Sequence, residues 1–205
     1  LENGLPNLLK HVENITKVFK LPAVVAINKF PLDTEAELQL VKDKCKELGV
    51  NVALSEVWAK GGEGGEELAK EVLRLIDENE GKFEFAYDEN QSIKEKINAI
   101  ATKIYGADGV DYTPNAEKQI LEIEKIGYDK LPICMAKTQY SLTDDQTKLG
   151  RPTGFKITVR NIKVSAGAGF LVALTGEIMT MPGLPKAPAA EKIDVDSTGK
   201  IAGLF

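Results

Sequence analysis

The sequence predicts an α/β fold, in which a parallel-sheet βαβ region is followed by a smaller β-rich C-terminal segment. A short apolar run rich in Val and Ile, at residues 22–28, is typical of a strand covered on both faces of a parallel sheet. Helices with capping signals follow this run, and the last of them should end at Gly127. From Gly154 onward the chain becomes β-rich and loses helical periodicity. We therefore divide it into an α/β region, 1–150, and a segment, 151–205, that packs on it.

Length and composition restrict the class of protein. With 205 residues, 43% of them hydrophobic and 28% charged, the chain is long enough to bury a core. A net charge of -5 without a Lys/Arg-dense stretch argues against a nucleic-acid partner. No apolar run approaches the roughly 20 residues of a membrane span, and the N-terminus lacks the pattern of a signal peptide. Cys45 and Cys134 read as reduced thiols, so we expect a cytoplasmic protein without membrane contact.

The first predicted element is a helix near the N-terminus. Its apolar residues recur at the spacing of one helical face: Leu5, Leu8, Leu9, Val12 and Ile15. His11 is the only histidine and falls on the polar side beside Lys10, which indicates a surface group rather than a base or a ligand. The chain begins at Leu1 instead of a methionine, so we expect a piece of a longer protein.

A βαβ unit follows this helix. Thr34 with Glu37 forms the pattern of a capping box and Gly49 follows the last apolar position, which predicts a helix over 35–48. Strand character resumes after that helix and ends near Trp58. Ligands of parallel α/β units gather beyond the carboxyl ends of the strands. The segments 28–31 and 54–58 should therefore lie side by side.

A glycine-rich stretch comes next. Residues 61–65 predict a loop that leads into a helix, where free backbone N–H groups could hold an anion. The pattern of that helix points four apolar side chains inward: Leu68, Val72, Leu73 and Ile76. The loop lacks the Gly-Lys-Ser/Thr ending of a P-loop, and no Walker A motif occurs in these 205 residues.

Further helix and strand signals fill the rest of the α/β region. Ser92 begins a helix that should stop at Gly106, and Thr113 caps a second one that Gly127 should end. Residues 131–137 read as another buried strand. Beyond Gly154 we expect a cluster of strands and then an ordered tail.

Two aromatic residues are candidates for a binding site, because each follows a predicted strand. Phe30 and Trp58 could simply pack in a core, as large aromatic residues usually do. Alternatively they form a clamp for a flat heterocycle, with Leu54 as an aliphatic floor. Pro31 would stiffen the turn that presents Phe30, although it could equally be a plain strand terminator.

Other polar patterns carry weaker signals. Asn28 and Lys29 resemble the start of the Asn-Lys-x-Asp motif of GTP-binding proteins, but the next acidic residue, Asp33, comes two positions too late. Asp33 instead reads as a turn residue before the helix cap, and Lys29 as a solvated or anion-facing charge. Asp144 and Asp145 could be a carboxylate pair, although clustered acids beside Ser and Thr usually form a turn.

Long stretches of the sequence carry a family resemblance. In chain order they read VVAINKFPLDTEAEL, SEVWAKGGEGG, KIYGADGV, LPICMAKTQYSL, GRPTGF, SAGAGF and MTMPGLPKAPAAEKIDVD. Together they resemble the C-terminal part of formate–tetrahydrofolate ligase, over essentially the whole chain. The resemblance implies a ligase that makes 10-formyltetrahydrofolate from formate, ATP and tetrahydrofolate through formyl phosphate. It also implies dependence on ATP with Mg, stimulation by a monovalent cation, and a homotetramer.

The resemblance also implies roles for individual residues. The pterin site of the family matches Phe30 and Pro31 after the first strand, and Leu54 and Trp58 after the next. The clamp is therefore our preferred interpretation of these residues. By analogy with other P-loop enzymes, Asn28 and Lys29 are expected near the nucleotide.

The resemblance also implies that the phosphate loop and the formate-binding residues of the family lie in an N-terminal half that we do not expect within these 205 residues. We therefore expect no catalytic residue and no metal ligand here, and no formyl phosphate synthesis by the fragment alone. The expected partners are tetrahydrofolate, the missing N-terminal half and, when intact, further copies in a homo-oligomer. The alternatives are a stand-alone, non-catalytic folate-binding module and an oligomerisation module.

Overall fold

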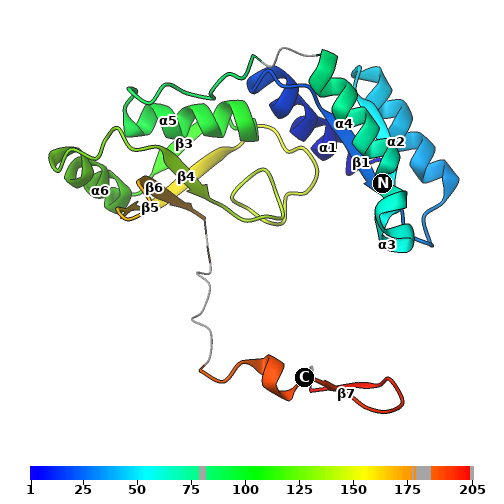
Figure 1. Ribbon diagram of the computed structural model, residues 1–205. Helices are drawn as coiled ribbons and strands as arrows, with labels where there is room; N and C mark the ends of the chain where they lie inside the picture. Colours follow the sequence, from blue (N-terminus) through cyan, green and yellow to red (C-terminus); the bar gives the residue numbers. More distant parts are fainter. Residues whose placement is uncertain (79–81, 177, 179–185, 204–205) are drawn as a thin grey trace.

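The computed structural model describes residues 1–78, 82–176, 178 and 186–203. Two lobes follow each other along the chain, and each is built around its own sheet (Figure 1). The first sheet has two parallel strands, and the second has four strands of mixed direction. Near the C-terminus a short antiparallel hairpin is present. This arrangement of parallel sheets, helices and a small β-rich C-terminal segment confirms the predicted fold class.

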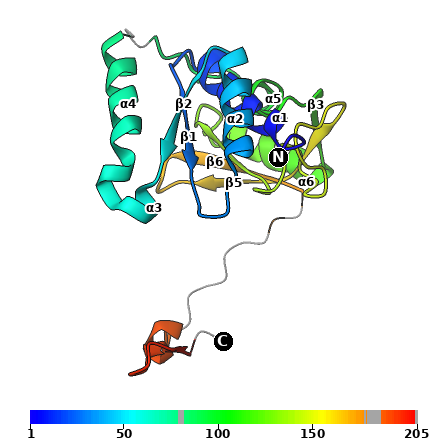
Figure 2. The ribbon, with the colours of Figure 1, turned by 90° about the vertical axis from the view of Figure 1, so that its right-hand side faces the viewer.

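The first lobe contains the βαβ unit that the sequence predicts. In order its elements are α1 (Leu5–Glu13), the π-helical η1 (Asn14–Val18), β1 (Val24–Asn28), α2 (Glu35–Glu47), β2 (Asn51–Ser55), α3 (Val57–Lys60), the 3₁₀ helix η2 (Gly61–Gly65) and α4 (Glu66–Glu78). The two strands run parallel, with Val24 opposite Asn51 and Asn28 opposite Ser55. Figure 2 shows α2 and α4 on opposite sides of this strand pair. The carboxyl ends of both strands therefore meet at one edge, as expected.

Local signals explain where α2 begins and what it covers. The Thr34 hydroxyl accepts the Glu37 backbone N–H at 3.3 Å, while the Glu37 carboxylate accepts the Thr34 N–H at 3.0 Å. This confirms the predicted capping box. The core under α2 is small, and its buried members are Val12, Val25, Cys45 and Val50.

The region from the glycine-rich stretch to α4 departs from two expectations. Residues 61–65 form the short 3₁₀ helix η2 instead of a loop. In α4, the side chains of Val72, Leu73 and Ile76 are 39%, 60% and 63% exposed, so their predicted inward orientation is wrong. Periodicity fixes which residues share a helix face, but a two-stranded sheet is too narrow to cover that face.

The second lobe combines three helical elements with four strands. They are α5 (Ile93–Ala99), the π-helical η3 (Ile100–Tyr105), β3 (Gly109–Tyr112), α6 (Pro114–Lys125), β4 (Ile133–Ala136), β5 (Lys156–Ser165) and β6 (Phe170–Thr175). The strand order is β3-β5-β6-β4, with only the central pair antiparallel. The predicted caps Ser92 and Thr113 are confirmed, and Gly106 ends η3 in the left-handed conformation at φ 77°.

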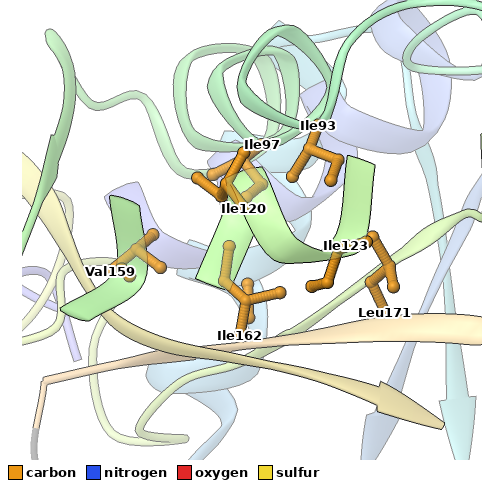
Figure 3. Packing of buried hydrophobic residues seen from close by; sticks show 9 residues of the cluster. Ile93, Ile97, Ile120, Ile123, Val159, Ile162 and Leu171 are labelled. Carbon is orange, nitrogen blue, oxygen red and sulfur yellow. The ribbon is translucent and has the colours of Figure 1, made fainter. Parts of the chain in front are cut away.

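A continuous apolar core fills the second lobe (Figure 3). Isoleucines of α5 and α6 face side chains of β5 and β6 in this view. The buried members are Ile93, Ile97, Ala116, Ile120, Ile123, Val159, Ile162, Leu171 and Ala173. Several of them are completely inaccessible to solvent, which marks this lobe as the better-covered part of the chain.

Residues of α1 and η1 join the two lobes. The Lys10 ammonium donates to the Lys103 carbonyl at 2.7 Å, and the Asn14 amide donates to the Ile104 carbonyl at 2.9 Å. Arg151 donates two hydrogen bonds to the Glu13 carboxylate, at 3.0 and 2.7 Å. His11 is exposed as predicted, but Lys10 beside it is buried, because its ammonium reaches a carbonyl of the other lobe.

The C-terminal segment contains the 3₁₀ helix η4 (Ala189–Lys192) and the hairpin of β7 (Asp194–Val195) and β8 (Ile201–Ala202). Residues 177 and 179–185 lie outside the described residues, and 179–185 are the motif MTMPGLPKAPAAEKIDVD from its start to its second proline. The boundary at residue 150 and the packing of 151–205 on the rest remain predictions. Within the described ranges no helix is both long and apolar enough to cross a bilayer.

Candidate functional site

The structure brings Phe30 and Trp58 together at the carboxyl ends of β1 and β2. Their ring centroids lie 6.1 Å apart, and the ring planes are inclined by 52°. Phe30 is 48% exposed and Trp58 is 71% exposed. This exposure contradicts the interpretation of the two rings as core residues of this chain. An exposed aromatic pair at the end of a parallel sheet is instead a surface on which a flat molecule can stack.

A hydrogen-bonded turn presents Phe30. The Lys29 backbone N–H donates to the Ser55 carbonyl at 2.9 Å, which extends the pairing of the two strands by one residue. The next N–H, that of Phe30, donates to the Asp33 carboxylate at 2.7 Å, and the Asp33 N–H returns a bond to the Phe30 carbonyl at 3.0 Å. Asp33 is therefore the turn residue that its position before the helix cap predicts.

A short helix presents Trp58. After β2 the Glu56 carbonyl accepts the N–H groups of Ala59 and Lys60, at 3.0 and 2.9 Å, and so starts α3. The Lys60 ammonium also pairs with the Glu56 carboxylate at 2.7 Å. On the other side, the Glu56 N–H donates to the Gly64 carbonyl at 3.0 Å. Trp58 thus stands on one helical turn that is tied to η2 at its N-terminal end, through Glu56.

Leu54 and Pro31 flank this aromatic pair in the chain. Leu54 is half-buried in β2, opposite Ile27 of β1. Pro31 directly follows Phe30 and is exposed at the turn. Their assignment to a pterin site remains a prediction.

Asn28 and Lys29 lie at the same edge of the sheet. Asn28 is the exposed last residue of β1. The Lys29 ammonium lies 3.1 Å from the Glu35 carboxylate in the first turn of α2. The Lys29 ammonium, which would have to pair with a nucleotide phosphate, is paired with Glu35 instead. The structure therefore adds no support to a nucleotide role for Lys29. That role stays a prediction.

The aromatic pair is closed in this structure. A planar molecule sandwiched between two rings needs about 3.5 Å on each side, or about 7 Å between the ring centroids. The observed separation of 6.1 Å with tilted planes means that the rings touch each other. Because Trp58 is the more exposed of the two, its side chain is the one free to move aside.

The charged groups beside Trp58 are fixed in their ionised forms. The hydrogen bond from the Lys60 ammonium holds the pKa of Glu56 below its usual value. The same bond raises the pKa of Lys60 above its usual value. Neither group is suited to transfer a proton near neutral pH. The arrangement can bind and orient a flat ligand, and among the described residues no cluster of three or more His, Cys, Asp or Glu could hold a metal ion.

A second polar cluster follows β4, in the second lobe. The carboxylate of Asp144 accepts the Thr158 N–H at 2.8 Å, and that of Asp145 accepts the Thr147 N–H at 3.0 Å. Both acids therefore hold backbone groups, which confirms the interpretation of this stretch as a turn. They line a largely polar cavity of about 1180 Å³ together with Lys137.

Sequence reasoning missed Lys137, which anchors this turn. Its ammonium donates to the Thr138 and Thr143 carbonyls at 2.9 and 2.8 Å and lies 5.2 Å from the centre of the Tyr105 ring. Burial lowers its pKa. No signal in the sequence separates this lysine from the many on the surface.

One comparison with known proteins bears on these findings. The model of a protein family described as formate–tetrahydrofolate ligase matches residues 1–205, which is the whole chain. The match therefore includes both lobes and both strand ends of the aromatic pair.

Proposed function

Because the chain belongs to the formate–tetrahydrofolate ligase family, we propose that it is the tetrahydrofolate-binding part of an enzyme that makes 10-formyltetrahydrofolate from formate, ATP and tetrahydrofolate. The observation that carries this proposal is the exposed contact between Phe30 and Trp58 at 6.1 Å. Two aromatic faces at the ends of adjacent parallel strands suit the flat, bicyclic pterin ring.

The pterin binds between the two rings after the Trp58 side chain turns aside. Phe30 stays in place, because Asp33 and Ser55 fix the backbone on both sides of it. Pro31 stiffens the turn, and Leu54 supplies an aliphatic surface at the end of β2. Each stacked face contributes on the order of 1 kcal/mol.

The contribution of this chain to the reaction is proximity and orientation. Holding the pterin at the strand ends places its nucleophilic nitrogen in a fixed position relative to an activated formyl group. The chain has no Walker A motif, and among its described residues no group of three or more His, Cys, Asp or Glu lies together. No phosphoryl step is therefore assigned to these residues.

Formation of formyl phosphate requires groups outside this chain. We assign ATP with Mg, the monovalent cation and the formate site to an N-terminal half of the same cytoplasmic enzyme, and we expect the intact enzyme to be a homotetramer. The 205 residues alone should not convert formate and ATP into formyltetrahydrofolate. Product formation by the isolated chain, followed by absorbance or mass spectrometry, would refute this assignment.

Titration with tetrahydrofolate tests the binding role. Trp58 is the only tryptophan of the chain, so stacking of a pterin should change its fluorescence in a saturable way. Replacing Phe30 with Ala should weaken binding by about tenfold, the scale of one lost aromatic contact. Calorimetry extends the measurement to Trp58→Ala, which has no tryptophan.

Leu32→Ala is the matched control for Phe30→Ala. Leu32 lies two residues from Phe30 in the same turn but is 93% exposed, so its loss should leave affinity unchanged. Equal affinity of the unmodified chain, Phe30→Ala and Trp58→Ala would exclude the aromatic pair as the binding site.

An oligomerisation module is the second candidate, and the exposed apolar face of α4 favours it. Leu73 and Ile76 together present a surface that their own lobe leaves open. Replacing both with Gln should abolish self-association in sedimentation experiments if this is the main role. Under the folate-binding proposal the same change leaves tetrahydrofolate affinity intact.

A further inference from the structure

The position of Trp58 needs an explanation, because packing does not provide one. Its side chain is 71% exposed. The helix that carries it, α3, has four residues and no side-chain cap at its N-terminus. Helices this short are unstable on their own, since nucleation fixes several residues for a single hydrogen bond. Contacts from outside α3 must therefore fix its position.

One such outside contact comes from Gly64. Its carbonyl accepts the Glu56 N–H at 3.0 Å, just before α3 begins. The two backbones approach so closely that a Cβ atom on Gly64 would lie 2.5 Å from the Glu56 carbonyl carbon and oxygen, and 2.9 Å from the Val57 nitrogen. These are backbone atoms, which cannot move aside as the end of a side chain can.

We infer that Gly64 is a positioning residue that sets where Trp58 stands relative to Phe30. The Glu56 carbonyl that faces Gly64 is the same group that accepts the N–H bonds of Ala59 and Lys60. Any displacement of this carbonyl therefore moves the whole of α3. The inference rests on the proposed function only for its effect on folate.

Phe30 does not follow such a movement. Its turn is held by the Asp33 carboxylate, which does not involve η2, while the Ser55 carbonyl that Lys29 binds lies one residue before the Glu56 carbonyl that faces Gly64. A shift of α3 thus changes the 6.1 Å distance between the rings instead of moving both together. Gly64 acts on the site through Glu56 and has no need to contact the ligand.

The same 3₁₀ helix provides a graded set of controls. A Cβ on Gly62 meets nothing within 4 Å, and a Cβ on Gly65 lies 3.1 Å from the Val57 Cγ2 methyl. The same methyl group can therefore be placed in three environments. Gly62→Ala places it in open space, Gly65→Ala against a side chain, and Gly64→Ala against the backbone. The effect on Trp58 should increase in that order.

The test compares these three variants of the 205-residue chain. Near-UV circular dichroism and fluorescence anisotropy report on Trp58 without ligand, calorimetry gives the affinity for tetrahydrofolate, and urea unfolding checks the fold. Gly64→Ala should alter both Trp58 signals and weaken affinity by about tenfold or more. Gly62→Ala should match the unmodified chain in both Trp58 signals and in affinity, and its only change should be a small gain in stability from the stiffer unfolded chain.

A rescue variant keeps the inference testable if Gly64→Ala does not fold. Gly65→Ala should alter the Trp58 signals mildly through the Val57 methyl, and adding Val57→Ala should restore them. Urea unfolding of both variants shows whether the Trp58 signals change while the free energy of unfolding does not, which separates a shift of α3 from a loss of stability. Failure of this rescue would overturn the inference.

The remaining outcomes separate the inference from the proposed function. Trp58 signals in Gly64→Ala identical to those in Gly62→Ala would overturn the positioning role. If those signals change while Phe30→Ala and Trp58→Ala bind tetrahydrofolate normally, Gly64 does position Trp58, and the proposed folate site is wrong.

Discussion

The two lobes of the chain differ in how much of their apolar surface they bury themselves. In the second lobe, Ile97 of α5 and Val159 of β5 are completely inaccessible to solvent. In the first lobe, Leu73 and Ile76 of α4 are 60% and 63% exposed, and Trp58 is 71% exposed. The first lobe therefore leaves the apolar face of α4 and the aromatic Trp58 open to other molecules, whereas the second lobe encloses a completely inaccessible core, although Leu121 and Ile126 remain 57% and 61% exposed.

Sheet width explains this difference. Four strands give α5 and α6 enough surface to pack on, and the isoleucines of both helices meet there (Figure 3). Two parallel strands offer too narrow a surface for α4 opposite α2. The candidate binding site lies in the lobe with the less complete core, at the open ends of its two strands.

A pair of isoleucine substitutions tests the contrast with the largest expected effect. Ile97→Ala in α5 should lower the free energy of unfolding by about 3 kcal/mol, because it leaves a cavity in a filled core. Ile76→Ala in α4 should change it by less than about 0.5 kcal/mol. Urea unfolding followed by circular dichroism measures both. Equal losses would mean that the exposed face of α4 is covered in solution.

Lysine substitutions sharpen the contrast further. The Lys96 side chain is fully buried, and its ammonium donates to the carbonyls of Asp129 and Leu131 at 3.0 Å each. Lys96→Met keeps the aliphatic stem but leaves both carbonyls unpaired, so we expect a loss of about 2 to 3 kcal/mol. Lys44→Met, at an exposed pair with Glu47, should have no measurable effect in the same unfolding experiment.

These lysines also show what the sequence could and could not predict. Capping boxes at Thr34 and Ser92 are local patterns, and both were predictable because their partners lie three residues away. The roles of Lys10 and Lys96 were not predictable, because their partners are distant along the chain. Lys10 donates to a carbonyl 93 residues away, and Lys96 donates to carbonyls 33 and 35 residues away. A lysine that binds distant carbonyls looks like any surface lysine until the fold is known.

The candidate site also has one feature that the sequence predicted and one that it did not. The meeting of Phe30 and Trp58 followed from the rule that the carboxyl ends of parallel strands share an edge. The close approach of Gly64 to Glu56 did not follow from any sequence rule. It depends on η2 forming a 3₁₀ helix where the sequence indicated a loop. Periodicity likewise identified the apolar face of α4 without showing that it is left open.

Trp58→Ala tests whether the first lobe really leaves its aromatic pair free. An exposed tryptophan should contribute less than about 1 kcal/mol to folding, whereas a tryptophan in a core contributes about 3 to 5 kcal/mol. The expected result is nearly unchanged urea unfolding with a large loss of tetrahydrofolate affinity. Unfolding of the variant under native conditions would instead make Trp58 a structural residue.

The smallest effect is expected where the lobes join, at the bond between Glu13 and Arg151. The Arg151 guanidinium holds the pKa of Glu13 below its ordinary value of 4.5. The folded chain therefore binds this proton less tightly than the unfolded chain. The stabilisation is fully present above about pH 4.5 and is lost as the pH falls through the lowered pKa.

Glu13→Gln should thus destabilise the chain by about 0.5 kcal/mol at pH 7, a small value because Arg151 is 37% exposed and screened by solvent. Its difference from the unmodified chain should shrink below pH 4.5 and in 1 M salt. Urea unfolding at both pH values, read by Trp58 fluorescence for the first lobe and circular dichroism for the whole chain, measures this. No difference at pH 7 would assign the coupling of the lobes to Lys10 and Asn14, which donate to carbonyls of the second lobe in both chains.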